Sequence, residues 1–199
     1  MDINRLKRPP RRLLAELMRI ESGEVLPDNF HVVNHNLRIY RSSQPSRAEF
    51  LELEKFGFKS VLNLRSHHSD LPLIAGLKLA ELRLPLHIIS ESDMTLALEI
   101  LRNAPKPVVI HCWHGSDRTG AVAAGCRIVF ENWSLERALE EFNQPAYGAH
   151  RHIYRMLPEL LKSFDWDKIR QDIAPVPETP CDAPAAESDR PIPDSNVEI

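Results

Sequence analysis

The stretch PVVIHCWHGSDRTG (Pro107–Gly120) decides the fold of this chain. It begins with an apolar run, Val108–Ile110, and passes through a polar loop into the segment Ala121–Phe130, which is apolar at nearly every position. A short apolar run, a turn and a helix that is hydrophobic on nearly all sides are typical of a buried strand followed by a buried helix. We therefore expect this strand and this helix at the centre of an α/β domain.

The loop between that strand and that helix has the properties of an anion site. The amino end of a helix presents unpaired N–H groups and the positive end of the helix dipole, and both favour an anion. The loop also holds a thiol, Cys112, and a guanidinium, Arg118. A nucleophile inside an oxyanion site indicates attack on phosphorus.

The segment HCWHGSDRTG (His111–Gly120) matches the signature H-C-x-x-G-x-x-R-[ST]-G of the cysteine-based protein tyrosine and dual-specificity phosphatases. The chain resembles compact bacterial dual-specificity members of that family over Leu26–Phe164. The features shared with them are YRSSQPS (Tyr40–Ser46), VLNLRSHHSD (Val61–Asp70) and YGAH (Tyr147–His150). The resemblance implies a protein-tyrosine-phosphatase-like fold and the hydrolysis of phosphomonoesters.

The residues of the loop have distinct expected roles. The resemblance implies that Cys112 forms a covalent cysteinyl-phosphate, with no metal or other cofactor, that Thr119 steadies the leaving thiolate and that His111 orients the loop. The planar guanidinium of Arg118 can hold two phosphoryl oxygens, which a lysine cannot do. Gly115 lets the backbone turn its N–H groups inward. The residues expected to bind substrate are Trp113, His114, Gly115, Ser116, Thr119 and His111, although Trp113 could equally pack into the fold.

The general acid has two candidates. The wider family takes the proton for the leaving oxygen from an Asp on a separate loop, and Asp93 is about twenty residues before Cys112 in the chain. Asp93 also has the character of an ordinary acid in the first turn of a helix. Asp117 lies inside the loop beside Arg118, where some related phosphoinositide phosphatases carry their acid. We favour Asp117 slightly, and both residues stay open at this point.

The composition is that of one domain with tails. In 199 residues, 25 Lys and Arg stand against 28 Asp and Glu, so the charge gives no general case for nucleic-acid binding. The three cysteines, Cys112, Cys126 and Cys181, are too widely spaced for a disulfide framework or a zinc site and fit a reducing compartment, so we expect a cytoplasmic protein. No apolar run reaches the roughly 18–20 residues of a membrane span.

Three regions are expected along the chain. Residues 1–25 form a basic arm with a short helix, residues 26–170 the phosphatase domain, and residues 174–199 a disordered, proline-rich acidic tail. The basic arm would suit contact with an anionic membrane surface, or a flexible segment whose helix packs on the domain.

Strands alternating with helices predict a mostly parallel twisted sheet flanked by helices, with the site at the carboxyl ends of the strands. The expected strands are Phe30–Val33 and Leu37–Tyr40, paired as an edge hairpin, Lys59–Leu64, Val108–Ile110 and Leu82–Leu86. The expected helices begin at a capping box, Ser46–Glu49, at an N-cap, Ser92, and at Ser134, which starts a helix through Phe142. A last helical region spans Ile153–Phe164, with Pro158 kinking or restarting it.

Two classes of phosphate ester are candidate substrates. Phosphotyrosine, with phosphoserine and phosphothreonine if the pocket is shallow, is the first hypothesis, and an inositol phosphate or phosphoinositide is the alternative. Phosphatases of the second kind often carry extra Lys or Arg in the loop, whereas this loop has Trp113, His114 and Asp117. A rhodanese-type sulfurtransferase usually has one residue fewer between Cys and Arg, and non-catalytic phosphate-binding relatives usually lack one of the two. Both are therefore disfavoured.

Overall fold

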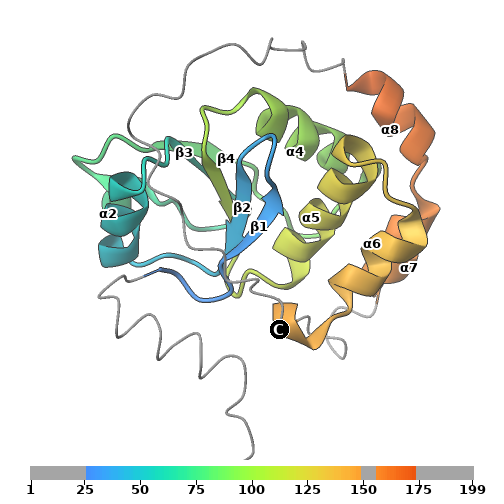
Figure 1. Cartoon of the computed structure of the whole chain (residues 1–199), viewed down its shortest axis with the longest axis horizontal. Coiled ribbons are helices and arrows are strands. Elements are labelled where there is room, and N and C mark those ends of the chain that lie inside the picture. Colours follow the sequence, from blue (N-terminus) through green and yellow to red (C-terminus); the bar gives the residue numbers. More distant parts are fainter. Residues whose placement is uncertain (1–25, 149–155, 174–199) are drawn as a thin grey trace, which may run out of the picture.

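The computed structural model describes residues 26–148 and 156–173, which form a five-stranded sheet between two layers of helices (Figure 1). The strand order is β1-β2-β5-β3-β4. Only β1 is antiparallel to its neighbour, and the other pairs are parallel. The expected mostly parallel α/β sheet is confirmed. The strands are β1 (His31–Asn34), β2 (Ile39–Ser42), β3 (Ser60–Asn63), β4 (Ala80–Arg83) and β5 (Val108–His111).

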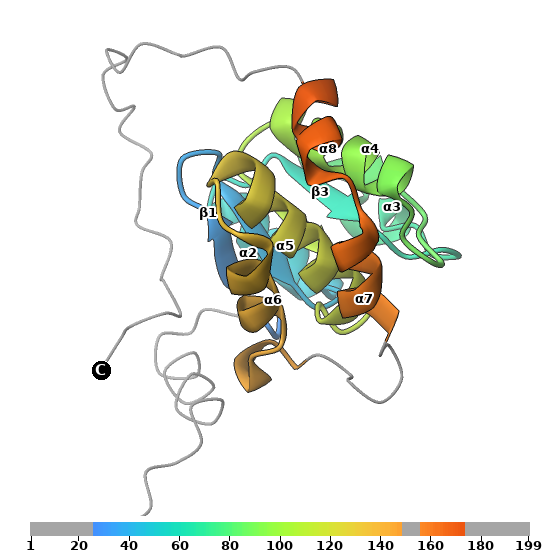
Figure 2. The same ribbon diagram turned by 90° about the vertical axis from the view of Figure 1, so that its right-hand side faces the viewer.

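Helices cover both faces of the sheet, as the two perpendicular views show (Figures 1 and 2). One face carries α2 (Arg47–Lys55) and the short α3 (Leu71–Ile74). The other face is covered by α4 (Glu91–Asn103), α5 (Asp117–Phe130), α6 (Leu135–Phe142), α7 (Met156–Ser163) and α8 (Trp166–Asp172). A short 3-10 turn, η2 (Pro145–Tyr147), follows α6. Side chains alternate between the two cores along β5, with Val108 and Ile110 on the α5 side and Val109 on the α2 side.

The register of β5 determines which loops meet at the site. Every residue of β5 is buried, because the strand has a parallel neighbour on each side and helices on both faces. His111 at its end pairs with Ser42 of β2 and with Asn63 of β3. The chain segments that leave β2, β3 and β5 therefore converge at one edge of the sheet.

Helix α5 is packed into the core along most of its length, as its apolar composition predicts. Small residues permit close packing of neighbouring elements. A Cβ on Gly125 would lie 2.5 Å from Met94 Sδ of α4. This close packing against α4 fixes the position of α5, whose amino end follows the loop after β5.

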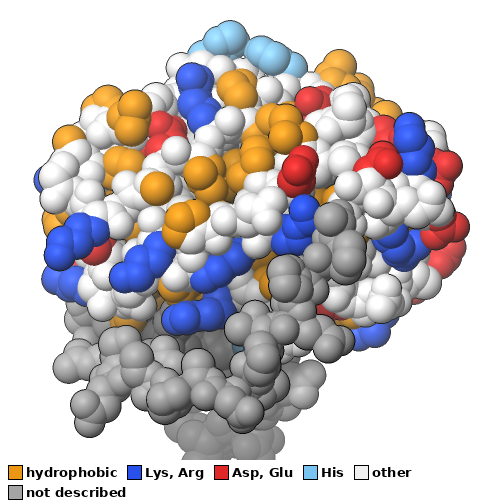
Figure 3. All heavy atoms as spheres, turned by 90° about the horizontal axis from the view of Figure 1, so that it is seen from above, with side chains coloured by type: hydrophobic (Ala, Val, Ile, Leu, Met, Phe, Trp, Pro, Cys, Tyr) orange, Lys and Arg blue, Asp and Glu red, His pale blue; other side chains and the backbone are white. Residues whose placement is uncertain are grey.

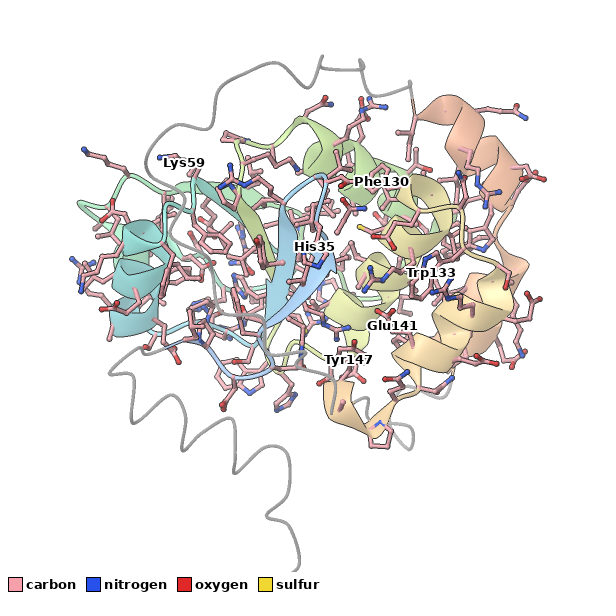
Figure 4. The ribbon with its side chains drawn as sticks, in the orientation of Figure 1. His35, Lys59, Phe130, Trp133, Glu141 and Tyr147 are labelled. Carbon is pink, nitrogen blue, oxygen red and sulfur yellow. The ribbon has the colours of Figure 1, made fainter. Side chains whose placement is uncertain are left out.

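The face opposite the converging loops carries mixed charge. In Figure 4 this face lies near Lys59 and Phe130, at the end of the molecule away from Tyr147. Seen directly in Figure 3, its Lys and Arg side chains gather mainly on one side and its Asp and Glu side chains on the other. This face therefore presents no uniformly basic surface. Within the described residues, no helix is both long and apolar enough to cross a membrane.

Several predicted boundaries hold and others are wrong. The capping box at Ser46 and Glu49 and the cap at Ser134 are confirmed. The N-cap of α4 is Ser90 and not Ser92, because Ser90 and Asp93 form a reciprocal capping box. The strand expected at Leu82–Leu86 is Ala80–Arg83. The backbone N–H of Leu84 donates to the carbonyl of Asn63, the last residue of β3, and that of Leu86 donates to Leu64 O just beyond it.

Other differences are smaller. The hairpin strands begin one and two residues later than predicted, at His31 and Ile39. Helices α3 and α8 were not predicted, because both are too short to show a periodic apolar stripe. Pro158 lies in the first turn of α7, where its missing N–H costs no helical bond. The arm and helix of residues 1–25, His150, Ile153 and the tail of residues 174–199 lie outside the described residues, so the predicted domain limits stay predictions.

Candidate active site

The loop from Cys112 to Ser116 joins the end of β5 to the first turn of α5. Cys112 is 2% exposed at the base of this loop. Gly115 has a φ of 71°, and a Cβ there would lie 2.3 Å from the carbonyl oxygen of Ser42. Only glycine fits this close approach of the loop to β2.

Three successive loop carbonyls are held by donors outside the loop. The backbone N–H of Gln44 donates to Trp113 O at 3.0 Å, Asn29 Nδ2 to His114 O at 3.1 Å, and Arg41 Nη2 to Gly115 O at 2.6 Å. In a planar trans peptide unit the carbonyl and the following N–H point in opposite directions. The N–H groups that follow these three carbonyls therefore face the other side of the loop, where an anion can bind them.

Arg41 is a support of this loop that the sequence analysis missed. Its side chain is buried beneath the loop, its guanidinium lies 4.6 Å from the centre of the Tyr147 ring, and Nη2 also reaches Ser116 O at 3.5 Å. Burial lowers the pKa of Arg41 to about 10, so the group is still charged at neutral pH. The signal in the sequence that could have identified Arg41 is its place in YRSSQPS, where an arginine falls within a buried strand. Asn29 was missed as well, because its positive φ of 56° and its contacts are visible only in the structure.

The amino end of α5 is not capped by its own serine. In α2, α4 and α6 the N-cap serine accepts a hydrogen bond from the backbone N–H three residues later. Ser116 makes no such bond, and its hydroxyl points to His114 O at 3.3 Å. The first N–H groups of α5 are thus available to a ligand instead of a cap. The buried hydroxyl of Thr119 has no hydrogen-bond partner in residues 26–148 and 156–173.

Arg118 is held by two backbone carbonyls at the same edge of the sheet. Its Nη1 donates to Leu64 O at 3.3 Å and to Leu86 O at 3.2 Å. Within the described part of the chain, nothing accepts a hydrogen bond from its Nη2. The guanidinium is therefore fixed through one terminal nitrogen while the other can contact an oxyanion.

Trp113 and His114 lie at the rim of the loop. Trp113 is 53% exposed, so it forms part of the surface beside the site and does not pack into the core. The Arg65 guanidinium stacks 4.3 Å from the centre of its ring and donates to Gln44 Oε1 at 2.8 Å. His114 is exposed next to it.

His111 lies behind the loop. Its ring is fully buried, with Nε2 2.6 Å from Asp70 Oδ2 and Nδ1 3.0 Å from Cys112 O. A ring enclosed in this way cannot touch a substrate, so the prediction that His111 binds substrate is wrong. Its predicted role in orienting the loop fits the bond to Cys112 O.

The two candidate acids have different environments. Asp93 Oδ2 accepts hydrogen bonds from Ser90 N at 3.0 Å and Ser90 Oγ at 2.6 Å, which complete the cap of α4. Asp117 is 5% exposed and is the first residue of α5, directly after the loop. The structure thus gives Asp93 a structural task and places Asp117 at the loop.

Cys126 has a different character from Cys112. It is fully buried in α5, and burial raises its pKa to about 12. A thiol in that state is neither a nucleophile nor a metal ligand at neutral pH. Cys181 lies outside the described residues.

We expect Gly115→Ala to destabilise the protein by roughly 2–4 kcal/mol and to lower kcat/KM sharply. The new Cβ would meet the Ser42 backbone and push the loop away from β2. Urea denaturation and steady-state turnover measure the two effects. The matched control is Gly76→Ala, which has a φ of 81° and no atom within 4 Å of the new Cβ, and should cost only about 1 kcal/mol with activity intact. Equal losses in both variants would contradict the steric argument.

Comparisons with known proteins agree with this geometry. The family model described as "Tyrosine phosphatase family" matches residues 24–176. Inositol diphosphatase SIW14 of Saccharomyces cerevisiae is 32% identical over 173 residues, covering 80% of this chain and 59% of that protein. Dual specificity protein phosphatase TpbA of Pseudomonas aeruginosa is 31% identical over 114 residues, covering 55% of this chain and 52% of that protein. The chain thus spans only somewhat more than half the length of these two relatives.

Two solved structures have a similar fold. The core catalytic domain of SIW14 superposes with a TM-score of 0.63 at 28% identity, covering 74% of this chain and 92% of that one. A TpbA variant with its cysteine changed to serine, crystallised with phosphotyrosine, superposes with a TM-score of 0.63 at 25% identity. That superposition covers 72% of this chain and 94% of the TpbA chain.

Proposed function

Because the chain belongs to the tyrosine phosphatase family, we propose that it hydrolyses phosphomonoesters through a cysteinyl-phosphate and acts on phosphotyrosine in proteins. One observation carries the proposal: Cys112 lies at the base of a loop whose N–H groups face an anion site, with Arg118 in the adjoining first turn of α5. The family match speaks against the sulfurtransferase hypothesis.

The reaction proceeds in two displacements. The Cys112 thiolate attacks phosphorus, an S–P bond forms, and the P–O bond to the leaving group breaks as an acid protonates the leaving oxygen. Water then attacks the cysteinyl-phosphate, the S–P bond breaks, and the conjugate base of that acid takes a proton from the water. Throughout, the loop N–H groups and the Arg118 guanidinium bind the non-bridging oxygens and stabilise their charge in the transition state.

Asp117 is the acid that this geometry favours. It adjoins the loop, whereas the carboxylate of Asp93 is engaged by Ser90 in the cap of α4.

Asp117→Asn should lower kcat on substrates with poor leaving groups by about 10²-fold and keep most of the rate on p-nitrophenyl phosphate, which needs no acid. Asp93→Asn should keep both rates, because the amide oxygen of asparagine can still accept the hydrogen bonds of Ser90. Single-turnover rates on phosphotyrosine peptide and on p-nitrophenyl phosphate provide the comparison. The reverse pattern would assign the acid to Asp93, and two unaffected variants would exclude both residues.

The exposed Trp113 ring supports an aromatic phosphoester as substrate, since the flat face of a phosphotyrosine ring can pack on it. The phosphotyrosine complex of TpbA fits this choice. Phosphoserine and phosphothreonine are substrates too if the site is shallow enough for shorter side chains.

A second candidate substrate is an inositol phosphate. It is favoured by Arg65, whose guanidinium lies at the rim of the loop on Trp113 and could bind a further phosphate, and by the activity named for SIW14. A turnover panel of phosphotyrosine and phosphoserine peptides against inositol hexakisphosphate and a diphosphoinositol phosphate tests the choice. A higher kcat/KM on the inositol compounds would replace the phosphoprotein proposal.

A further inference from the structure

Arg41 is a buried cation that forms no ion pair within the described residues. Its side chain is buried in β2, a strand with a neighbour on each side. Nη2 donates to the carbonyls of Gly115 and Ser116, which are neutral, and the buried Nε has no hydrogen-bond partner in residues 26–148 and 156–173. A buried charge is costly unless it is paired, so this arrangement requires an explanation.

The surroundings of the Arg41 guanidinium are enclosed and largely apolar. A Cβ on Gly120 of α5 would lie 3.4 Å from Arg41 Nη2 and 2.9 Å from the Phe142 ring of α6, so the absence of a side chain at Gly120 makes room for Arg41. The Tyr147 ring of η2 covers the guanidinium as well. Burial lowers the pKa of Arg41 to about 10, and the surrounding charges do not offset this effect. Where water is excluded in this way, a charge acts more strongly on its neighbours than it does in solvent.

Glu141 of α6 is the first candidate for a counter-charge within the protein, but it is engaged by another arginine. Its two carboxylate oxygens lie 3.2 and 3.0 Å from Nε of Arg127. Arg127 also pairs with Glu131, whose side chain is partly exposed. Among the described residues, no carboxylate is therefore dedicated to Arg41.

The anion site lies on the far side of the two carbonyls that Arg41 holds. The N–H groups that follow these carbonyls in the chain belong to Ser116 and Asp117. In a planar trans peptide unit such N–H groups point away from the carbonyls. A single layer of peptide units therefore separates the guanidinium from an anion bound to these N–H groups, a distance of about 8 Å from covalent and hydrogen-bond lengths.

We propose that an anion in the loop is the counter-charge of Arg41, and that Arg41 is a positioning residue whose buried charge makes the site favour doubly charged oxyanions. The Coulomb energy is proportional to the charge of the ligand, so a dianion gains twice as much from Arg41 as a monoanion of the same shape. A phosphomonoester is mainly a dianion at neutral pH, whereas a phosphodiester is a monoanion. The resulting preference for monoesters rests on the proposed function, whereas the preference for dianions does not.

The first test compares two tetrahedral oxyanions of different charge, the dianion tungstate and the monoanion perrhenate, by NMR titration. Arg41→Gln removes the charge and keeps an amide that can donate to a loop carbonyl. The ratio of the perrhenate Kd to the tungstate Kd should fall by about threefold or more, because the second charge of tungstate loses its interaction. Arg41→Lys keeps the charge and should retain most of the ratio. Equal weakening of both anions in Arg41→Gln, or an equal fall of the ratio in Arg41→Lys, would overturn the proposal.

Arg170→Gln is the matched control. It makes the same change at an arginine that also bonds a carbonyl of α5, Ile128 O at 3.1 Å, but in the last turn of that helix. Arg170 is paired with Asp167 and partly exposed, so solvent and salt screen its charge and the ratio should stay within about twofold of the unmodified protein. A fall equal to that in Arg41→Gln would show that net charge alone sets the preference, which would also overturn the proposal.

The second test uses the unmodified protein, so it holds even if Arg41→Gln does not fold. The Nε–H of Arg41 makes no hydrogen bond to the described part of the chain, so its ¹H–¹⁵N signal, assigned by its absence in Arg41→Lys, reports the local field. Saturation with tungstate should shift this signal about twice as far as saturation with perrhenate. Equal shifts would overturn the proposal. Neither test uses a substrate, so a failure here leaves the phosphatase activity untouched, and an inactive protein with the expected preference would contradict only the proposed function.

Discussion

Cys112→Ser abolishes phosphatase turnover, with an expected loss of about 10⁴-fold or more, while the protein still binds a phosphate analogue such as tungstate. A serine hydroxyl at neutral pH is not ionised, so no nucleophile is present to form the S–P bond. The loop N–H groups and Arg118 are unchanged, so the anion site persists. Turnover on p-nitrophenyl phosphate and calorimetric titration with tungstate measure the two properties separately.

Cys126→Ser is the matched control for that experiment. It makes the same atomic change in a buried thiol of α5, and we expect at most a modest loss of stability with turnover retained. Full activity in Cys112→Ser would exclude the covalent mechanism. A loss of tungstate binding in that variant would show instead that the thiolate helps to form the site.

Arg118→Lys should lower kcat/KM by about 10²–10³-fold, although it preserves the positive charge. The guanidinium uses one terminal nitrogen to bond Leu64 O and Leu86 O, and in the proposed mechanism the other binds the phosphoryl group. An ammonium group is shorter and lacks this planar fork, so it cannot make both sets of bonds. The effect should fall mainly on kcat, because the contact strengthens as charge develops on the equatorial oxygens.

Arg127→Lys offers a control in the same helix. Arg127 lies toward the other end of α5, where it pairs with Glu131 and Glu141 and stacks on Trp133; Figure 4 labels Trp133 and Glu141 near one another. This variant should lose some stability and keep its kcat. Equal loss of kcat in the two variants would indicate a general effect on α5 and not a specific contact of Arg118 with phosphate.

The sequence predicts most accurately those structural features whose residues lie close together in the chain. The run Val108–Ile110 and the small apolar residues after Gly120 predict a buried strand and helix, and the structure confirms both. The capping box at Ser46 is likewise local, since its two partners are three residues apart. The start of α4 was misplaced because Ser90 and Ser92 are both suitable caps in sequence, and only the hydrogen bonds of Asp93 distinguish them.

Side chains that act across the sheet could not be predicted in this way. Arg41 bonds a carbonyl 74 positions away, and Asn29 bonds one 85 positions away. No periodicity or spacing links such residues, because their proximity follows from the order in which parallel strands pair. Asp93 was a candidate acid from the sequence because the sequence does not show the hydrogen bond from Ser90 that occupies its carboxylate.

By itself the sequence predicted the candidate nucleophile, the candidate phosphate-binding arginine and the loop that carries them, because Cys112, Gly115 and Arg118 lie within one strand–loop–helix unit. The tertiary structure decided what supports that unit. It placed β2 and β3 on either side of β5, and so brought Arg41 beneath the loop and Asp70 against His111. Buried charges need partners, and the partners come from whichever strands pair, which is a property of the folded sheet.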